Sequence, residues 1–155
     1  MVKIRKLLEY NDVERRAFFK AFSKLTWDEF IENREASFFS IRNIFIHTLN
    51  ATSYWLDFVQ GKNHQPNRKF EDYTSLKDVE VYMQKVEKCM HDYFKTLSSG
   101  ELNKKHQFSG SGKLEELTTE DILIHIFEEE IHHRGELIAL FWQMGIEPPV
   151  IGYPP

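Results

Sequence analysis

Residues 125–136, HIFEEEIHHRGE, gather many titratable side chains inside a stretch whose apolar residues recur at helical spacing. In a helix, one face of this stretch has apolar residues at its ends and polar residues in its middle. The members of that face are Ile122, Ile126, Glu129, His133, Glu136 and Leu140. A carboxylate or imidazole buried there without a partner costs several kcal/mol, so these groups require either water or a partner.

Glu129 and His133 stand one helical turn apart, which allows both side chains to converge on a single ion. His47 occupies a core-type position on an earlier apolar stripe, which indicates that it projects from a neighbouring helix. Together the three residues supply nitrogen and oxygen ligands and leave a fourth position open. This arrangement is typical of catalytic zinc sites, and it also suits nickel or ferrous iron.

Simpler interpretations of the same residues remain open. Glu129 and His133 also fit an exposed ion pair, and His47 also fits a hydrogen-bonded core histidine. The pairs formed by Glu128 with His132 and by Glu130 with Arg134 are interpreted as solvated. His125 lies one turn before Glu129 and is interpreted either as a ligand or as a polar residue at the edge of a cleft.

Two other chemistries find little support. The spacings of Glu130 with His133 and of Glu129 with His132 match the Glu-x-x-His step of di-iron bundles, but the chain has no second such step on another helix.

Cys89 is the only cysteine, which excludes an intrachain disulfide. Few positive groups surround it in the sequence, so we interpret it as a small packed or half-exposed residue rather than a nucleophile.

The chain has 155 residues, of which 41% are hydrophobic and 14% aromatic, and we expect residues 1–155 to form a single globular domain. Its formal net charge of −4 and its lack of a basic cluster argue against nucleic acid as a partner. No apolar stretch has the length of a signal peptide or a membrane span. We therefore expect a soluble cytoplasmic protein without membrane attachment.

The elements that must position these residues are helical, because apolar residues recur at three- and four-residue steps in four long segments. The pattern predicts an all-α four-helix bundle, with a capping box in residues 26–29 before a short extra turn. The four helices are predicted over residues 12–25 with Asp12 as N-cap, from 37 or 40 to 60, over 75–97, and from 118 or 119 to 144. Residues 98–117 form a long connection, predicted to hold a small hairpin or a flap that partly covers the site.

Two segments, IRNIFIHTLNATSYWL and HHRGELIALFWQMGIEPP, resemble the DinB/YfiT-like superfamily of four-helix bundles. The resemblance spans the whole chain in order, including the His-Arg-Gly step at 133–135, the histidine at 47 and the closing Gly145 and Pro148. It implies a homodimer that holds a divalent metal, usually nickel or zinc. The implied ligands are His47, His133 and position 129, where this chain has Glu instead of the usual His.

Glutamate is a competent ligand for zinc, nickel or iron, although its charge makes a bound cation a weaker Lewis acid. The resemblance further implies a transferase that uses bacillithiol or another low-molecular-weight thiol and acts on a small-molecule substrate. His125, Arg134 and Glu136 are then expected to orient the ligands or the substrate. The alternatives are a non-catalytic metal-binding or dimerising bundle, and a metal-dependent hydrolase with Glu128 or Glu130 as base.

Overall fold

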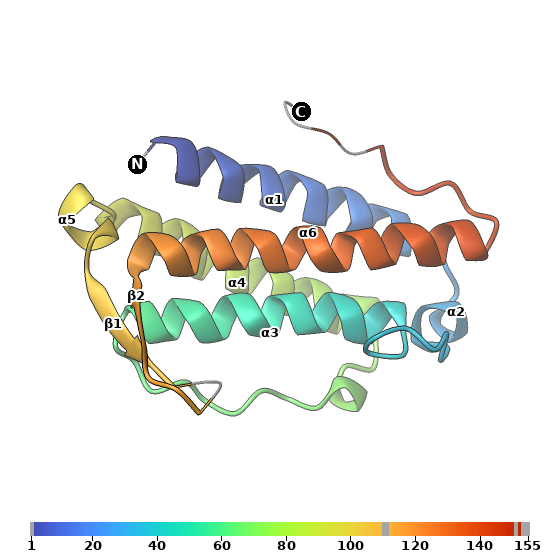
Figure 1. Ribbon diagram of the computed structural model, residues 1–155. Coiled ribbons are helices and arrows are strands. Elements are labelled where there is room, and N and C mark those ends of the chain that lie inside the picture. The colour runs from blue at the N-terminus through green and yellow to red at the C-terminus, as the bar shows by residue number, and fades with distance from the viewer. Residues whose placement is uncertain (1, 110–111, 151, 153–155) are drawn as a thin grey trace.

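Four long amphipathic helices lie side by side in the computed structural model, which describes residues 2–109, 112–150 and 152 (Figure 1). They are α1 (Val2–Phe22), α3 (Ile41–Val59), α4 (Leu76–Thr96) and α6 (Thr119–Gln143). A short helix, α2 (Trp27–Ile31), follows α1, and its capping box between Thr26 and Glu29 is present as predicted. The predicted all-α four-helix bundle is confirmed.

The order of the helices around the bundle places α3 directly against α6. Each of these two helices has a second neighbour, because α3 also packs on α4 and α6 also packs on α1. Figure 1 shows that α3 and α6 run antiparallel, whereas α3 and α4 run in the same direction. The connection between α3 and α4 therefore travels back along the bundle, and it contains only one turn of 3₁₀ helix, η1 (Phe70–Asp72). In this topology α3 and α6 are neighbours and together form one face of the molecule.

Local capping sets the ends of the two helices that carry the candidate site. Ser40 accepts a hydrogen bond from the backbone of Asn43 at the start of α3, and Thr118 forms a capping box with Asp121 at the start of α6. Both helices stop before a glycine with positive φ, Gly61 at 65° and Gly145 at 70°. The predicted boundaries of both helices are thus confirmed to within a few residues, with Ser40 rather than Ser37 as the cap of α3.

The prediction that Asp12 caps the first helix is wrong. Helix α1 begins ten residues earlier, at Val2, because Ile4 and Leu8 continue the apolar stripe and are buried in the core. Asp12 lies inside this helix and is also buried, where it pairs with Arg15 at 2.7 Å and with His91 at 2.8 Å. Its carboxylate is therefore part of the interior and not a helix cap.

Residues 98–118 contain the small hairpin that their length suggested. A one-turn helix, α5 (Ser99–Leu102), leads into strand β1 (Lys105–Phe108), which pairs antiparallel with β2 (Glu115–Thr118). The ring centroid of Phe108 lies 4.9 Å from that of Trp55 and 5.8 Å from that of Phe58. The hairpin consequently leans on the C-terminal half of α3, two turns away from His47 (Figure 1).

A layer of charged and polar side chains divides the core into two apolar clusters. One cluster surrounds Phe22 and Phe141, and the other surrounds Leu8 and Ile126. All four long helices contribute to the layer at a position between their residues in the two clusters. The layer includes Arg15 of α1, Thr52 of α3, Glu87 of α4 and Glu130 of α6, all of which are buried. No helix in the described part of the chain is long and apolar enough to cross a membrane.

Candidate metal centre

His47 of α3 and Glu129 and His133 of α6 bring one donor atom each to the same point between the two helices. A glutamate oxygen, Oε2 of Glu129, lies 3.6 Å from Nε2 of His47 and 3.5 Å from Nε2 of His133. The side chain of His133 is only 7% exposed, whereas those of His47 and Glu129 are 28% and 29% exposed. The three donors thus surround a point that is closed on the side of the bundle and open toward solvent.

The separations between these atoms favour ligands of one ion over direct hydrogen bonds. Both exceed the range of about 2.7–3.2 Å that is usual for N–H···O hydrogen bonds. Ligands at about 2.0–2.1 Å from a tetrahedral zinc ion stand roughly 3.3 Å from one another, which is close to the spacing found here. Two imidazole nitrogens and one carboxylate oxygen are also the donor types that zinc, nickel and ferrous iron accept. The donor set therefore fits such an ion.

Glu136 fixes the orientation of the His133 ring from the side opposite Glu129. Its Oε2 lies 2.6 Å from Nδ1 of His133 and accepts a second hydrogen bond from the Ser37 hydroxyl at 2.8 Å. A proton held on Nδ1 by this carboxylate leaves Nε2 with its lone pair directed toward Glu129. Glu136, which is expected from the sequence to orient the ligands or the substrate, thus contacts His133 directly.

Electrostatics keep the imidazole of His47 neutral, which is the form that binds metals. Burial and the nearby His133 lower the pKa of His47, and the carboxylate of Glu129 only partly opposes them. Burial alone would raise the pKa of Glu136, but the hydrogen bonds from His133 and Ser37 outweigh it, so this pKa is lowered. Glu136 is accordingly ionised and able to hold the Nδ1 proton of His133.

Phe38 closes one side of the site, and sequence reasoning did not find it. Its ring stacks on His47 with the centroids 3.9 Å apart and meets the ring of His133 edge to face at 5.5 Å. The segment that carries Phe38 and Ser37 is a tight turn in which Glu35 and Phe39 both have positive φ, at 58° and 71°. Such values are costly for residues other than glycine, so the contacts of this turn must hold it in place.

A second group of donors, His132, His133 and Glu136, also lies close enough together to be considered. It would require Nδ1 of His133 to release its 2.6 Å hydrogen bond to Glu136 and bind an ion instead. His132 is exposed on the surface of α6. The group that contains His47 leaves the hydrogen bond of His133 intact and is therefore the better candidate.

The remaining residues singled out in the sequence have different surroundings. His125 is partly exposed and packs edge to face on Trp55 at 5.3 Å, one turn beyond Glu129. Arg134 is buried and directs its guanidinium to α1, where it donates to Asn11 at 3.2 Å. These contacts are with α1 and not with His47 or Glu129, so they do not support a role in orienting the ligands or the substrate.

The interpretation of Glu130 and Arg134 as a solvated pair is wrong, because both side chains are about 6% exposed. Glu130 forms an ion pair with Arg15 and lies 3.5 Å from the hydroxyl of Thr52. Burial raises the pKa of Glu130, although Arg15 acts in the opposite direction. Glu128 and His132, by contrast, are exposed as expected.

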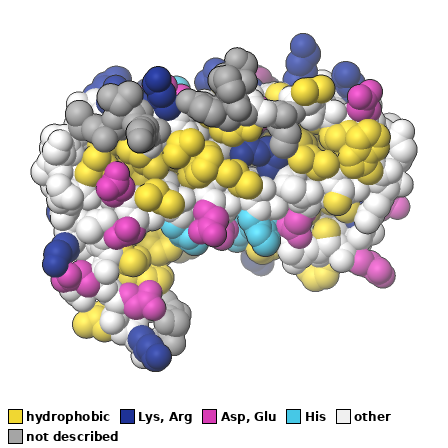
Figure 2. Space-filling model, turned by 45° about the horizontal axis from the view of Figure 1, so that its top comes forward, with side chains coloured by type: hydrophobic (Ala, Val, Ile, Leu, Met, Phe, Trp, Pro, Cys, Tyr) yellow, Lys and Arg dark blue, Asp and Glu magenta, His cyan; other side chains and the backbone are white. Residues whose placement is uncertain are grey.

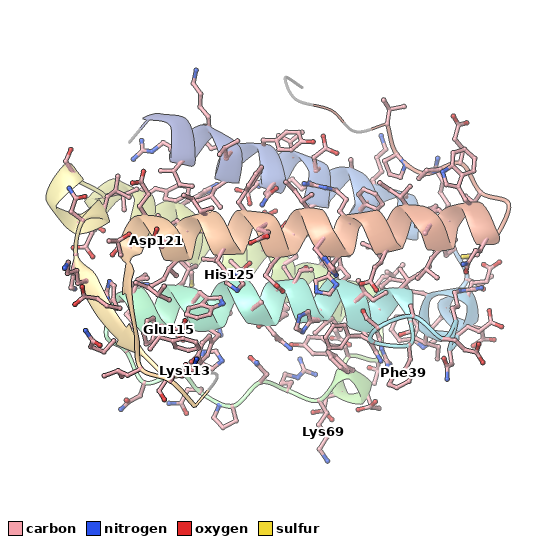
Figure 3. The ribbon with its side chains drawn as sticks, viewed as in Figure 1. Phe39, Lys69, Lys113, Glu115, Asp121 and His125 are labelled. Carbon is pink, nitrogen blue, oxygen red and sulfur yellow. The ribbon has the colours of Figure 1, made fainter. Side chains whose placement is uncertain are left out.

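Figure 2 shows the site in its setting on the surface of the molecule. Histidine and acidic side chains form a row along a hollow that separates a projecting lobe from the rest of the bundle. Figure 3 shows His125 on the side of α6 that faces α3, so this residue lies along the same face as the donors. The described residues of the hairpin contact α3 near Trp55 and leave the donors open to solvent.

Comparisons with known proteins agree with this fold. A protein of Bacillus subtilis (strain 168), described as uncharacterized protein YizA, is 28% identical over 144 residues, which cover 92% of this chain and 89% of the relative. A DinB-like protein of Bacillus cereus ATCC 10987 has a similar solved structure, with a TM-score of 0.77, 18% identity and coverage of 98% of this chain and 97% of the other.

A second solved structure, the DinB-like protein YjoA of Bacillus subtilis, superposes with a TM-score of 0.65 at 16% identity and covers 93% of this chain and 96% of the other. At such identities the two structures establish the fold alone. The family model for the DinB family matches residues 1–155, the full length of the sequence. The chain therefore belongs to the DinB family.

Proposed function

We propose that this protein binds a divalent transition metal ion through Nε2 of His47, a carboxylate oxygen of Glu129 and Nε2 of His133. The observation that carries the proposal is the convergence of these three atoms from two helices, at 3.5 and 3.6 Å around one carboxylate oxygen. Zinc and nickel suit the donor set best, and ferrous iron is a third candidate.

We further propose that the site serves a thiol S-transferase, in which a low-molecular-weight thiol such as bacillithiol attacks a small electrophile. The open side of the site supports a catalytic over a purely structural ion, because structural zinc sites have four protein ligands. When bound, the ion lowers the pKa of a thiol in the open position and holds the resulting thiolate. His47 and His133 orient that position, while Phe38 shields one side of it from water.

Hydrolysis of a substrate by a metal-bound water is the less favoured reaction. It needs a general base within hydrogen-bond reach of that water. Of the two carboxylates considered for this role, Glu130 is buried in an ion pair with Arg15, and Glu128 has a side chain that is 78% exposed. Neither belongs to the group of donors that converges with His47.

The reaction is tested by incubating zinc- and nickel-loaded protein with bacillithiol and a panel of electrophiles while free thiol is measured over time. Consumption above the uncatalysed rate, lost in His47→Ala, supports the transferase. Full metal loading without turnover for any thiol would instead indicate a metal-binding protein without catalytic activity. A protein that retains no metal would exclude both the transferase and the non-catalytic metal-binding protein.

Glu136→Gln is expected to weaken zinc binding by roughly tenfold to 100-fold, because it removes the charge that holds the Nδ1 proton of His133. Competition with a chromogenic chelator measures this change. Glu128→Gln is the matched control, since it removes the same charge from an exposed position on the same helix. Equal zinc affinities in the two variants would show that the hydrogen bond to His133 has no role in binding.

A homodimer is also part of the proposal. One strip of α6 carries Ile131 and Trp142 with 45% and 60% of their surface exposed. Gly135 lies between them, and within the described residues nothing beyond its own stretch of helix lies within 4 Å of the position that a Cβ would take there. A second copy of the chain would cover this strip without steric conflict. Light scattering of the purified protein distinguishes a dimer from a monomer.

A further inference from the structure

We propose that a cavity between α3, α4 and the segment that connects them binds a small aromatic carboxylate. This α3–α4 cavity has a volume of about 380 Å³, which lies within the range of about 300–1,000 Å³ that is usual for small-molecule sites. No donor residue of the candidate metal centre lines it. It is therefore a second site, separate from the metal centre and independent of the proposed transferase.

The segment that connects α3 to α4 is held against α3, so its side of the cavity is preformed. Figure 1 shows this segment running back along the bundle. Nδ1 of His64 lies 2.8 Å from Oδ2 of Asp57 on α3, and the ring of His64 meets that of Tyr54 edge to face at 5.4 Å. Nε2 of His64 lies 3.2 Å from Oδ1 of Asn67 in the same segment. A wall that is fixed before a ligand arrives lowers the entropic cost of binding.

Two cationic side chains line the cavity without a carboxylate partner. Arg68 comes from the connecting segment and Lys85 from α4, so they belong to different walls. Among the described residues, neither side chain forms an ion pair with an aspartate or a glutamate. Each therefore keeps a positive charge that a ligand can neutralise.

The two carboxylates of the lining, in contrast, are already engaged by donors of the protein. Asp57 pairs with His64. Asp78 accepts hydrogen bonds from the hydroxyls of Thr74 and Ser75, at 3.1 and 3.0 Å, beside the start of α4. The charges in the cavity that lack a partner are thus positive, which favours an anion over a cation as the ligand.

The guanidinium of Arg68 is fixed in position and keeps N–H groups for a ligand. It lies over the ring of Tyr73, 4.3 Å from the centroid, and one of its terminal nitrogens donates to the backbone carbonyl of Asp72. The other N–H groups of a guanidinium form a fork that matches the two oxygens of a carboxylate. Lys85 adds a point charge on a flexible stem. The two residues therefore suit a carboxylate held by Arg68, with Lys85 as a second cation.

Aromatic and apolar side chains supply another part of the cavity wall. The rings of Tyr73 and Tyr82 pack with their centroids 5.5 Å apart, and Pro66 and Val81 also line the cavity. Val81 is 55% exposed although it is apolar. A flat ring in the cavity would cover this surface, whereas an inorganic anion would leave it in water. The wall thus favours an aromatic body on the anion.

The binding test compares 2-naphthoate with 2-naphthamide, which has the same shape and no charge, by equilibrium dialysis. The amide is expected to bind about tenfold more weakly or worse, because it cannot neutralise the two cations. Arg68→Gln and Lys85→Gln are each expected to weaken the binding of 2-naphthoate by about tenfold. Lys69→Gln is the matched control, since Figure 3 shows Lys69 pointing away from the helices. This variant should leave the dissociation constant within a factor of about two.

Cys89 reports whether the probe occupies this cavity. It is the only cysteine of the chain, it is exposed, and it lines the cavity. Saturating 2-naphthoate is expected to slow the alkylation of Cys89 by iodoacetamide about fivefold or more, because a bound ring excludes the reagent. Mass spectrometry of the intact protein measures the rate. The same protection is expected in His47→Ala, in which the probe cannot be held by an ion at the metal centre.

Circular dichroism verifies that each variant is folded before its binding is compared. Absence of binding by the parent, or equal binding of the acid and the amide, would overturn the site. So would binding that is unchanged in both Arg68→Gln and Lys85→Gln, or binding that leaves the alkylation of Cys89 unaffected. Loss of probe binding in His47→Ala would place the carboxylate at the metal centre and would also overturn it.

Discussion

His133→Ala is expected to weaken zinc binding by about 100-fold or more. Structural zinc sites with four ligands bind with about 10–16 kcal/mol, or roughly 3 kcal/mol per ligand, and about 1.4 kcal/mol corresponds to a factor of ten. His133 is also the most buried of the three donors, and among the described residues no other histidine, cysteine or carboxylate joins His47 and Glu129 in such a group. Competition between the protein and a chelator of known affinity measures the change.

His132→Ala is the matched control for this variant. The residue is the sequence neighbour of His133 and has the same side chain, but it is exposed on α6. Its replacement should leave the zinc affinity within a factor of about two. An effect of His132→Ala as large as that of His133→Ala would favour the alternative donor group of His132, His133 and Glu136.

Arg15→Ala is expected to lower the free energy of unfolding by about 3–5 kcal/mol, the cost of breaking a buried ion pair by removing one partner. Arg15 is buried between Asp12, Glu87 and Glu130, whose carboxylates would be left in the interior without it. A loss of this size is a large part of the 5–15 kcal/mol that stabilises a typical domain. Urea unfolding followed by circular dichroism measures it.

The neighbouring Arg16 provides the control, because it also pairs with Glu87 but has a side chain that is 59% exposed. Arg16→Ala should cost no more than about 1 kcal/mol, as is usual for exposed pairs. Similar losses for the two variants would contradict the buried network. A double variant, Arg15→Met with Glu130→Leu, should recover part of the loss, since it removes both charges of one pair and replaces them with apolar bulk.

The sequence was sufficient to predict the bundle because its strongest signals are local or periodic. The apolar stripe of α4, including Val79, Met83, Val86 and Met90, is buried as its spacing required. The caps at Ser75 and Thr118 are equally local, since each serine or threonine meets a backbone amide three residues later. Such features depend on a few adjacent residues and on no tertiary information.

The charged residues could not be assigned in the same way. Glu130 and Arg134 have the spacing of an exposed pair, and only the packing of α1 shows that each has its partner there, in Arg15 and Asn11. The extended start of α1 belongs to the same problem, because Asp12 looks like a helix cap until its burial beside Arg15 is known. Burial of a charge is decided by contacts between residues far apart in the sequence.

The sequence was sufficient to predict the donor residues of the candidate site but not the residues that surround them. His47, Glu129 and His133 are of metal-binding types at spacings that a helix brings together. Ser37 and Phe38 have no such signature, and their positions depend on a turn with positive φ at Glu35 and Phe39. Glutamate and phenylalanine do not indicate a positive φ, because glycine and asparagine are the residues that usually adopt it.

The metal content of protein purified without a histidine tag tests the central claim most directly. Elemental analysis after refilling with zinc or nickel should find close to one ion per chain in the parent and little in His47→Ala, Glu129→Ala and His133→Ala, with all four proteins folded. Less than about a tenth of an ion per chain in the refilled parent, or equal metal content in parent and variants, would contradict a metal site formed by His47, Glu129 and His133.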